Sequence, residues 1–188
     1  MQNAEWTAAQ EGAEVSQASF CILHSAFRIH GNRMKALYPG SFDPPHLGHL
    51  DLIRRASAQV EHLVIGVALN PDKQPLLGAD QRIALLTTLT RELGNVSAVA
   101  YQGATVTFAK AQGCTVLLRG LRNAADLDAE FGMAQVNRAN GLDTLFLVAD
   151  AAHQHLSSRL VKLVAAAALP LDALVPSAVI AFLTRRSA

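Results

Sequence analysis

Apolar residues along the chain gather in short runs that alternate with longer segments in which they recur every three or four positions. Short runs rich in Val, Ile and Leu, bounded by turn residues, predict buried strands. Such runs lie at Lys35 to Tyr38, His62 to Leu69, Val96 to Tyr101, Thr115 to Leu118 and Thr144 to Val148. Five strands are therefore expected, each separated from the next by a helical pattern.

The intervening segments have the apolar spacing of helices, and Gly, Asn or Pro stands near several of their ends. Helices are expected at about His49 to Val60, Asp80 to Leu93, Val106 to Ala111, Asp126 to Ala139, Ser157 to Ala168, and after Pro176. Apolar strands joined by helices indicate a parallel sheet covered on both faces. Right-handed crossovers then give an α/β fold: a Rossmann-like, doubly wound, five-stranded parallel sheet in a single domain.

The first 33 residues do not share this alternation. Their acidic residues precede the first basic one, Arg28, so neither a secretory signal nor a mitochondrial presequence fits. We expect residues 1–33 to be a poorly ordered N-terminal extension, or to lie upstream of a true start at Met34. Residues 34–188 are expected to form the domain.

Composition narrows the classes of function. Of the 188 residues, 51% are hydrophobic, and 16 basic against 15 acidic residues give a net charge of +1. No basic surplus predicts a nucleic-acid or membrane surface, and no apolar stretch in the C-terminal half is long enough to span a bilayer. Cys21 and Cys114 fit neither a disulfide framework nor a zinc finger, which favours the cytoplasm.

Ligands of doubly wound sheets bind beyond the carboxyl ends of the strands. The turns expected there span residues 39–49, 70–78, 102–105, 119–125 and 149–157. In the first turn, Gly40 permits backbone geometry that a Cβ would forbid, and Gly48 leaves room at a helix N-terminus, where phosphate binds well. Zinc binding by His46 and His49 would need a further ligand, and nothing nearby supplies one, so no protein-held metal is expected.

Basic and hydroxyl residues stand in the later turns. Lys73 is an ordinary solvated lysine or a mobile charge for an anionic substrate. Arg119 and Arg122 offer guanidinium groups that match phosphate oxygens. Ser157 and Ser158 open a helix, where they serve as an N-cap, as phosphate ligands, or as both.

The string from Pro39 to His49 resembles the nucleotidyltransferase superfamily with an H-x-G-H or T-x-G-H signature, with His46 in its first position. Asn70 to Pro75, Leu118 to Arg122 and Leu156 to Ser158 narrow the resemblance to bacterial phosphopantetheine adenylyltransferases, from about Met34 onward. The resemblance implies adenylyl transfer from ATP to 4′-phosphopantetheine. Dephospho-coenzyme A and pyrophosphate would form by direct in-line displacement, as a step of coenzyme A biosynthesis.

The resemblance also implies roles for individual residues. His49 would stabilise the transition state, aided by the charges of Lys73 and Arg122. The positions implied to bind the acceptor are Ser41, Lys73, Thr105 and Arg119. The positions implied to bind ATP are Ser41, Phe42, His49, Gly120, Leu121, Arg122, Glu130, His153, Gln154, His155, Leu156, Ser157, Ser158 and Arg159.

Three positions depart from the family pattern. His153 stands where the family commonly has an aromatic residue, and Arg159 replaces the third serine of a run. Thr105 stands where the family usually has an apolar residue. These departures bear on substrate affinity more than on the type of reaction, because Arg159 adds charge near the expected triphosphate.

Further implications concern Mg²⁺ and partners. The resemblance implies Mg²⁺ that bridges phosphate oxygens with water ligands rather than a protein cage. It also implies a homohexamer and feedback binding of coenzyme A, with no nucleic-acid or membrane partner. Two alternatives stay open: a related transferase that uses nicotinate mononucleotide or CTP, and a non-catalytic nucleotide-binding module.

Overall fold

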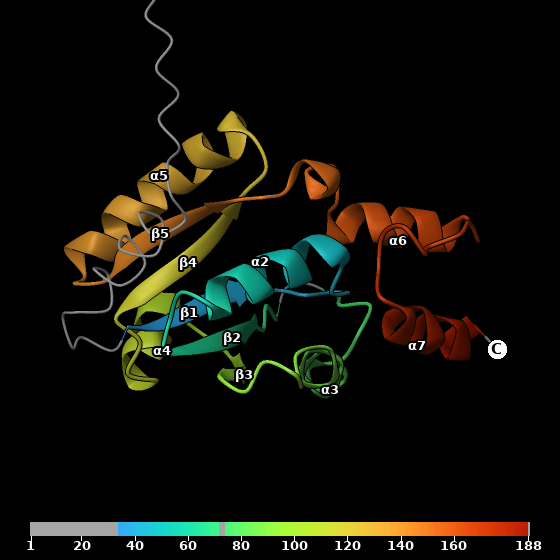
Figure 1. The fold of residues 1–188 in the computed structure, drawn as a ribbon, viewed down its shortest axis with the longest axis horizontal. Coiled ribbons are helices and arrows are strands. Elements are labelled where there is room, and N and C mark those ends of the chain that lie inside the picture. The colour runs from blue at the N-terminus through green and yellow to red at the C-terminus, as the bar shows by residue number, and fades with distance from the viewer. Residues whose placement is uncertain (1–33, 72–73, 188) are drawn as a thin grey trace, which may run out of the picture. The chain divides into compact units, whose positions relative to one another are not determined.

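The computed structural model describes residues 34–71 and 74–187, which lie within one compact unit from Arg33 to Ala188. Five parallel strands form its sheet: β1 (Lys35–Gly40), β2 (His62–Ala68), β3 (Val96–Tyr101), β4 (Val116–Leu121) and β5 (Asp143–Val148). Their order is β3-β2-β1-β4-β5, so the winding reverses between β1 and β4 (Figure 1). The predicted doubly wound parallel sheet is confirmed.

The helices follow the predicted alternation. They are α2 (Leu47–Ser57), α3 (Ala79–Leu89), α4 (Thr105–Ala111), α5 (Ala124–Ala139), α6 (Ser158–Ala166) and α7 (Ser177–Ser187). A short 3₁₀ helix, η1 (Ala151–His153), was not expected from the sequence. Asp150 begins it by accepting a hydrogen bond from the Ala152 N–H at 2.8 Å, which is a local side-chain cap that apolar spacing does not reveal.

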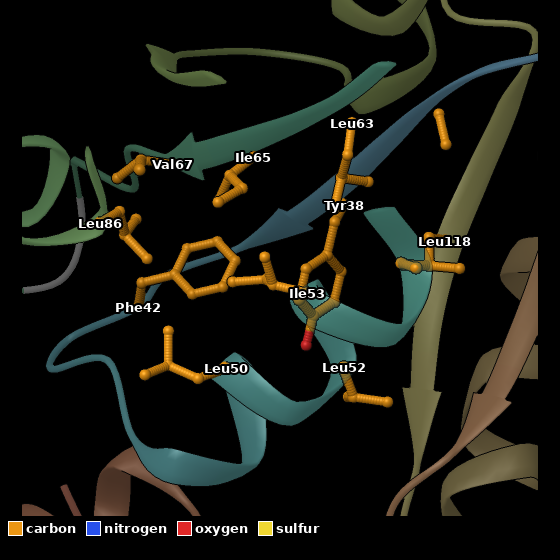
Figure 2. Close-up of a cluster of buried hydrophobic side chains, with 12 residues drawn as sticks. Tyr38, Phe42, Leu50, Leu52, Ile53, Leu63, Ile65, Val67, Leu86 and Leu118 are labelled. Carbon is orange, nitrogen blue, oxygen red and sulfur yellow. The ribbon is translucent and has the colours of Figure 1, made fainter. Parts of the chain in front are cut away.

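Alternate residues of β1 face opposite layers of the molecule. Tyr38 packs with Phe42 and Ile53 in a cluster on the side of α2 and α3 (Figure 2). Leu37 packs instead with Ala109 of α4 in a second cluster. The central strands are thus buried on both faces, and this rigid base holds the turns that follow them.

Strand β4 is longer than the sequence predicted. Arg119, Gly120 and Leu121 were expected in a turn, but they pair with Phe146, Leu147 and Val148 of β5. The prediction was wrong because it ended the strand at the first charged residue. Pairing with a neighbouring strand outweighs the low strand preference of a glycine or an arginine.

Helices α6 and α7 lie beyond the carboxyl ends of the strands (Figure 1). Their apolar faces join α3 in a third buried cluster, formed by Leu77, Leu85, Val161, Val175 and Val179. This cluster fixes the start of α6 beside the turn after β1. Within residues 34–71 and 74–187, no helix is both long and apolar enough to cross a membrane.

Candidate active site

Two cavities adjoin at the carboxyl ends of the strands. The smaller has a volume of about 300 Å³ and lies between the start of α2, the end of β4 and the start of α6. The larger has a volume of about 670 Å³ and lies among the turn after β2, the start of α3 and α6. Ser41 and Ser158 line both cavities, so the two spaces meet at these serines.

Many of the predicted site residues are brought together here. The smaller cavity is lined by Ser41, His49, Gly120, Arg122, His153, Leu156, Ser157 and Ser158. Arg159 lines the larger cavity and not the smaller one, which the histidines line. Tyr38, His46 and Leu52 also line the smaller cavity and were not in the predicted set. His46 is itself the first position of the signature, whereas Tyr38 and Leu52 lie only near it in the sequence.

Other predicted residues line neither cavity. They are Phe42, Thr105, Arg119, Leu121, Glu130, Gln154 and His155. Lys73 falls outside the described residues. Thr105 begins α4, where its hydroxyl lies 2.9 Å from that of Tyr101, so its nearest visible role is structural.

Phe42 supports the site from beneath. Its side chain is fully buried, meets the ring of His49 edge-on with centroids 4.9 Å apart and lines neither cavity. Its φ of 48° is uncommon for a bulky residue, and such outliers cluster at functional sites. A Cβ on Gly40 would lie 2.9 Å from the Phe42 ring, so Gly40 is required for packing rather than for unusual backbone geometry.

His46 and His49 hold each other through their backbones and rings. Nδ1 of His46 accepts a hydrogen bond from the His49 N–H at 3.3 Å, and Nδ1 of His49 accepts one from the His46 N–H at 3.2 Å. The two rings stack with centroids 3.6 Å apart. Because both Nδ1 atoms are acceptors, each neutral ring carries its proton on Nε2.

The electrostatic surroundings keep both rings neutral. Burial, aided by the charges of Arg122 and His153, lowers the pKa of His46 to about 4. Burial also lowers the pKa of His49 well below its usual value, and the charges of His46 and Arg122 act in the same direction. His49 therefore presents a neutral Nε2–H donor near pH 7.

The N-terminus of α2 offers fewer free donors than the sequence suggests. The His49 N–H is taken by His46, and the Leu47 N–H donates to the Leu174 carbonyl at 3.0 Å. The expected phosphate site at this helix start must therefore rely on the histidine side chains as well as the backbone. The start of α2 has fewer free N–H groups because the His46 imidazole caps it, and apolar spacing does not predict such a cap.

Asp126, which was not among the predicted site residues, orients the Arg122 side chain. Asp126 accepts from Arg122 Nε at 2.9 Å and from Nη2 at 3.0 Å. The hydrogen bond to Asp126 raises the pKa of Arg122, and the reciprocal bond lowers the pKa of Asp126. The i,i+4 spacing of these two residues was the available signal.

Arg119 is engaged by groups of the protein itself. Its Nε donates to Glu130 at 2.9 Å, Nη2 also pairs with Glu130, and Nη1 donates to the Pro39 carbonyl at 3.0 Å. Glu130 therefore holds Arg119 in this structure, where sequence reasoning assigned it to ATP. The pair joins α5 to the end of β1.

The start of α6 is fixed by both serines. Ser157 is the N-cap and accepts from the Leu160 N–H at 3.1 Å, as its position before the helix suggests. Ser158 donates to the Pro44 carbonyl at 2.9 Å, which ties α6 to the first turn. Both residues thus serve structure and still line the smaller cavity.

Asp43 organises the wall of the larger cavity. Its carboxylate accepts from the N–H of Leu76 at 2.9 Å and of Leu77 at 2.7 Å, and it pairs with Lys162 of α6. Burial alone would raise the pKa of Asp43, but the bonds from Lys162, Leu76 and Leu77 outweigh it and hold that pKa below its usual value. One carboxylate therefore joins the first turn, the segment after β2 and α6.

Metal-binding side chains do not gather at the site. Among residues 34–71 and 74–187, no group of three His, Cys, Asp or Glu residues is placed to hold a metal ion. The carboxylate of Asp43, which lines the larger cavity, is already occupied by two N–H groups and an ammonium group.

Comparisons with known proteins identify the family of the chain. The cytidylyltransferase-like family model matches residues 37–164. A phosphopantetheine adenylyltransferase of Synechococcus sp. (strain WH7803) is 46% identical over 81% of this chain and 93% of its own length. One from Gloeobacter violaceus is 47% identical over 76% of this chain and 90% of its own length.

A solved structure shows the same fold at much lower sequence similarity. It is described as a nicotinate-nucleotide adenylyltransferase of Vibrio parahaemolyticus, with a TM-score of 0.60 and 15% identity over 81% of this chain and 93% of that one. Identity at this level supports the fold alone. The identity to the curated relatives covers most of both chains, and the chain belongs to the phosphopantetheine adenylyltransferase family of nucleotidyltransferases.

Proposed function

We propose that this protein transfers the adenylyl group of ATP to 4′-phosphopantetheine, forming dephospho-coenzyme A and pyrophosphate. Its family membership supports this reaction, since its relatives carry the name phosphopantetheine adenylyltransferase. The structural observation that carries the proposal is the meeting of two cavities at Ser41 and Ser158. A group transfer between two substrates needs such a junction, because the reacting atoms must approach in line.

We assign ATP to the smaller cavity and the acceptor to the larger. The smaller cavity has the neutral His49 donor and the Arg122 guanidinium, which suit a nucleotide phosphate. The larger cavity is bounded by Asn70, Pro71, Gln74 and Pro75, the residues that flank Lys73. A long phosphorylated acceptor fits its greater volume.

The chemistry requires positioning and charge stabilisation. The acceptor phosphate is already an anion, so it attacks the α-phosphorus of ATP without a general base, and pyrophosphate leaves. The new P–O bond forms as the bond to pyrophosphate breaks. His49 Nε2–H and Arg122 would stabilise charge on the transferring phosphoryl group, with Lys73 as a further cation from the segment after β2.

We further propose that Mg²⁺ enters with ATP. Its chemistry would be to neutralise phosphate charge, while its remaining ligands would be water. His49 and Arg122 would still have to orient the α-phosphate. Arg159, which replaces a neutral serine of the family pattern, would add a cation near the tail of the nucleotide where the cavities join.

The experiment is a pyrophosphate-release assay with ATP and Mg²⁺, with and without 4′-phosphopantetheine, together with mass detection of the product. We expect release only with the acceptor, and a product of the mass of dephospho-coenzyme A. Parallel reactions contain nicotinate mononucleotide or CTP. Activity only in one of those reactions would replace the acceptor or the nucleotide, and ATP binding without any turnover would favour a non-catalytic module.

We also propose a cytoplasmic homohexamer that binds coenzyme A as a feedback ligand. An apolar surface on α5 supports assembly, because Leu127, Phe131, Met133 and Val136 are all exposed in the single chain. Light scattering of the purified protein should give the mass of six chains. A single-chain mass at micromolar concentration would contradict the hexamer, and unchanged turnover with added coenzyme A would contradict the feedback.

A further inference from the structure

Two cations of the larger cavity were not selected by any sequence motif. Arg82 lies in the first turn of α3 and is only 4% exposed. Lys162 lies on α6, one turn after Ser158, and its side chain is 39% exposed. Both line the larger cavity together with Ser41 and Ser158, the residues at which the substrates are proposed to meet.

Arg82 carries a buried charge that the protein compensates only with neutral groups. Its Nη1 donates to the Ser41 carbonyl at 2.8 Å, and its Nε lies 3.4 Å from the Gly78 carbonyl. Among residues 34–71 and 74–187, no carboxylate forms an ion pair with it. A buried guanidinium without a counter-ion is costly, and an anion in the adjoining cavity would reduce that cost.

Lys162 is held in place but keeps donors to spare. Asp43 pairs with its ammonium group, and the same carboxylate already accepts the N–H groups of Leu76 and Leu77. An ammonium group has three donors, so one bond to Asp43 leaves capacity for a ligand in the cavity that Lys162 lines. Asp43 thus acts as a positioning residue for Lys162.

The charges of the cavity wall do not balance. Among the described residues, Arg82, Arg159 and Lys162 line the larger cavity, and Asp43 supplies the one carboxylate there. We propose that Lys162 and the buried Arg82 form a second phosphate-binding subsite in this cavity, with Lys162 making the direct contact and Arg82 supplying the positive floor beneath Ser41. Its ligand is a phosphate group, carried by the acceptor or by the β- and γ-phosphates of the nucleotide. The inference rests on the proposed two-substrate reaction only for the names of those carriers.

The test measures binding without turnover. Isothermal titration of the full-length protein with inorganic pyrophosphate, and separately with 4′-phosphopantetheine, gives the Kd of each for the wild type and for Lys162→Gln and Lys162→Arg. We expect Lys162→Gln to weaken at least one ligand by about tenfold or more, since it removes a hydrogen bond from a charged donor. Lys162→Arg should recover most of the affinity. The ligand that loses affinity identifies the source of the phosphate.

Arg91→Gln is the matched control, because Arg91 is an exposed cation beyond the far end of α3. It removes one positive charge from the chain and should change neither Kd. A purely structural role for Lys162 would lower the melting temperature of Lys162→Gln while leaving the Kd of both ligands unchanged. That result would overturn the subsite. A wild type that binds neither pyrophosphate nor 4′-phosphopantetheine would also overturn it.

Arg82→Met tests the floor of the subsite, with Arg82→Lys as the charge-retaining partner. If Arg82→Met does not fold, the comparison of wild type with Arg82→Lys at increasing salt replaces it. The subsite predicts a weaker Kd in Arg82→Lys, and an identical Kd at every salt concentration would contradict the role of Arg82. A wild type that binds pyrophosphate through Lys162 but forms no dephospho-coenzyme A would refute the proposed function and leave the subsite standing.

Discussion

The two cavities are built by contacts of different range. In the smaller cavity, His46 fixes His49 three residues away, and Asp126 fixes Arg122 four residues away. In the larger cavity, Asp43 reaches Leu77 of a distant segment and Lys162 near the end of the chain. The smaller cavity, the proposed nucleotide side, is therefore organised locally, whereas the larger cavity, the proposed acceptor side, depends on the tertiary packing of α3 and α6.

The two cavities also differ in the charge of the side chains that line them. Near pH 7 the stacked histidines of the smaller cavity are neutral donors, because burial lowers their pKa values. The larger cavity presents Arg82, Arg159 and Lys162. In the proposed reaction, the attacking phosphate would be held by full charges on its own side, while the neutral His49 donor and the Arg122 guanidinium would act from the smaller cavity.

The largest expected effect is on the locally built side. His49→Ala should lower kcat by about 10²–10³, because it removes an oriented donor from the transferring phosphoryl group. His62→Ala is the control, since His62 begins β2 at the other end of the sheet, where its Nε2 lies 2.8 Å from the Ser97 hydroxyl. Steady-state kinetics measure both variants. A kcat near the wild-type value would remove His49 from the mechanism.

The next effect concerns Arg119 of β4. Arg119→Ala should raise KM for 4′-phosphopantetheine by about tenfold or more, with a smaller change in KM for ATP. The alternative is a purely structural role, because Arg119 pairs with Glu130 and lines neither cavity in the structure. Arg138→Ala, on the exposed end of α5, is the control. An unchanged KM for the acceptor would reduce Arg119 to a structural residue.

A third prediction tests the neutral histidines. The unfolded chain protonates His46 below pH 6.5, whereas the folded protein resists protonation until about pH 4. The free energy of unfolding should therefore fall as the pH drops from 6.5 towards 4, by up to about 1.4 kcal/mol per pH unit for such a histidine.

His46→Asn should reduce this slope, because asparagine is a good N-cap and does not titrate. Urea unfolding at pH 7, 6 and 5 measures the slope for the wild type and the variant. Parallel curves for the two proteins would show that His46 is not held neutral by the fold.

The smallest expected effect is on the aim of Arg122. Asp126→Asn should raise KM for ATP by about twofold to fivefold, because partly exposed i,i+4 ion pairs contribute little. Asp128→Asn, two residues further along α5 and exposed, should have no effect. A change in KM for 4′-phosphopantetheine instead of ATP would reverse the assignment of the cavities.

Features built from local contacts were the ones that the sequence could predict. Strands and helices were predictable because their apolar periods are local, and β3 has the expected bounds. The smaller cavity was largely predictable, since its residues lie in compact motifs such as the turn that ends at His49. The exception, Asp126, was visible only as an i,i+4 partner of Arg122.

The acceptor side was not predictable in the same way. Nothing near Lys162 in the sequence indicates that it meets Asp43, and the burial of Arg82 follows only from the packing of α3 against the first turn. The predicted end of β4 was wrong for a related reason, because pairing with β5 extends the strand beyond Arg119. Long-range contacts have no local period, so no pattern in the sequence predicts them.

The most direct test is a crystal structure of the protein with a non-hydrolysable ATP analogue and 4′-phosphopantetheine. The two-cavity arrangement predicts the adenine nucleotide in the smaller cavity and the pantetheine arm in the larger. The α-phosphate should lie between Ser41 and Ser158, within hydrogen-bond reach of His49 Nε2. Both substrates in one cavity, or an α-phosphate out of reach of His49, would contradict it.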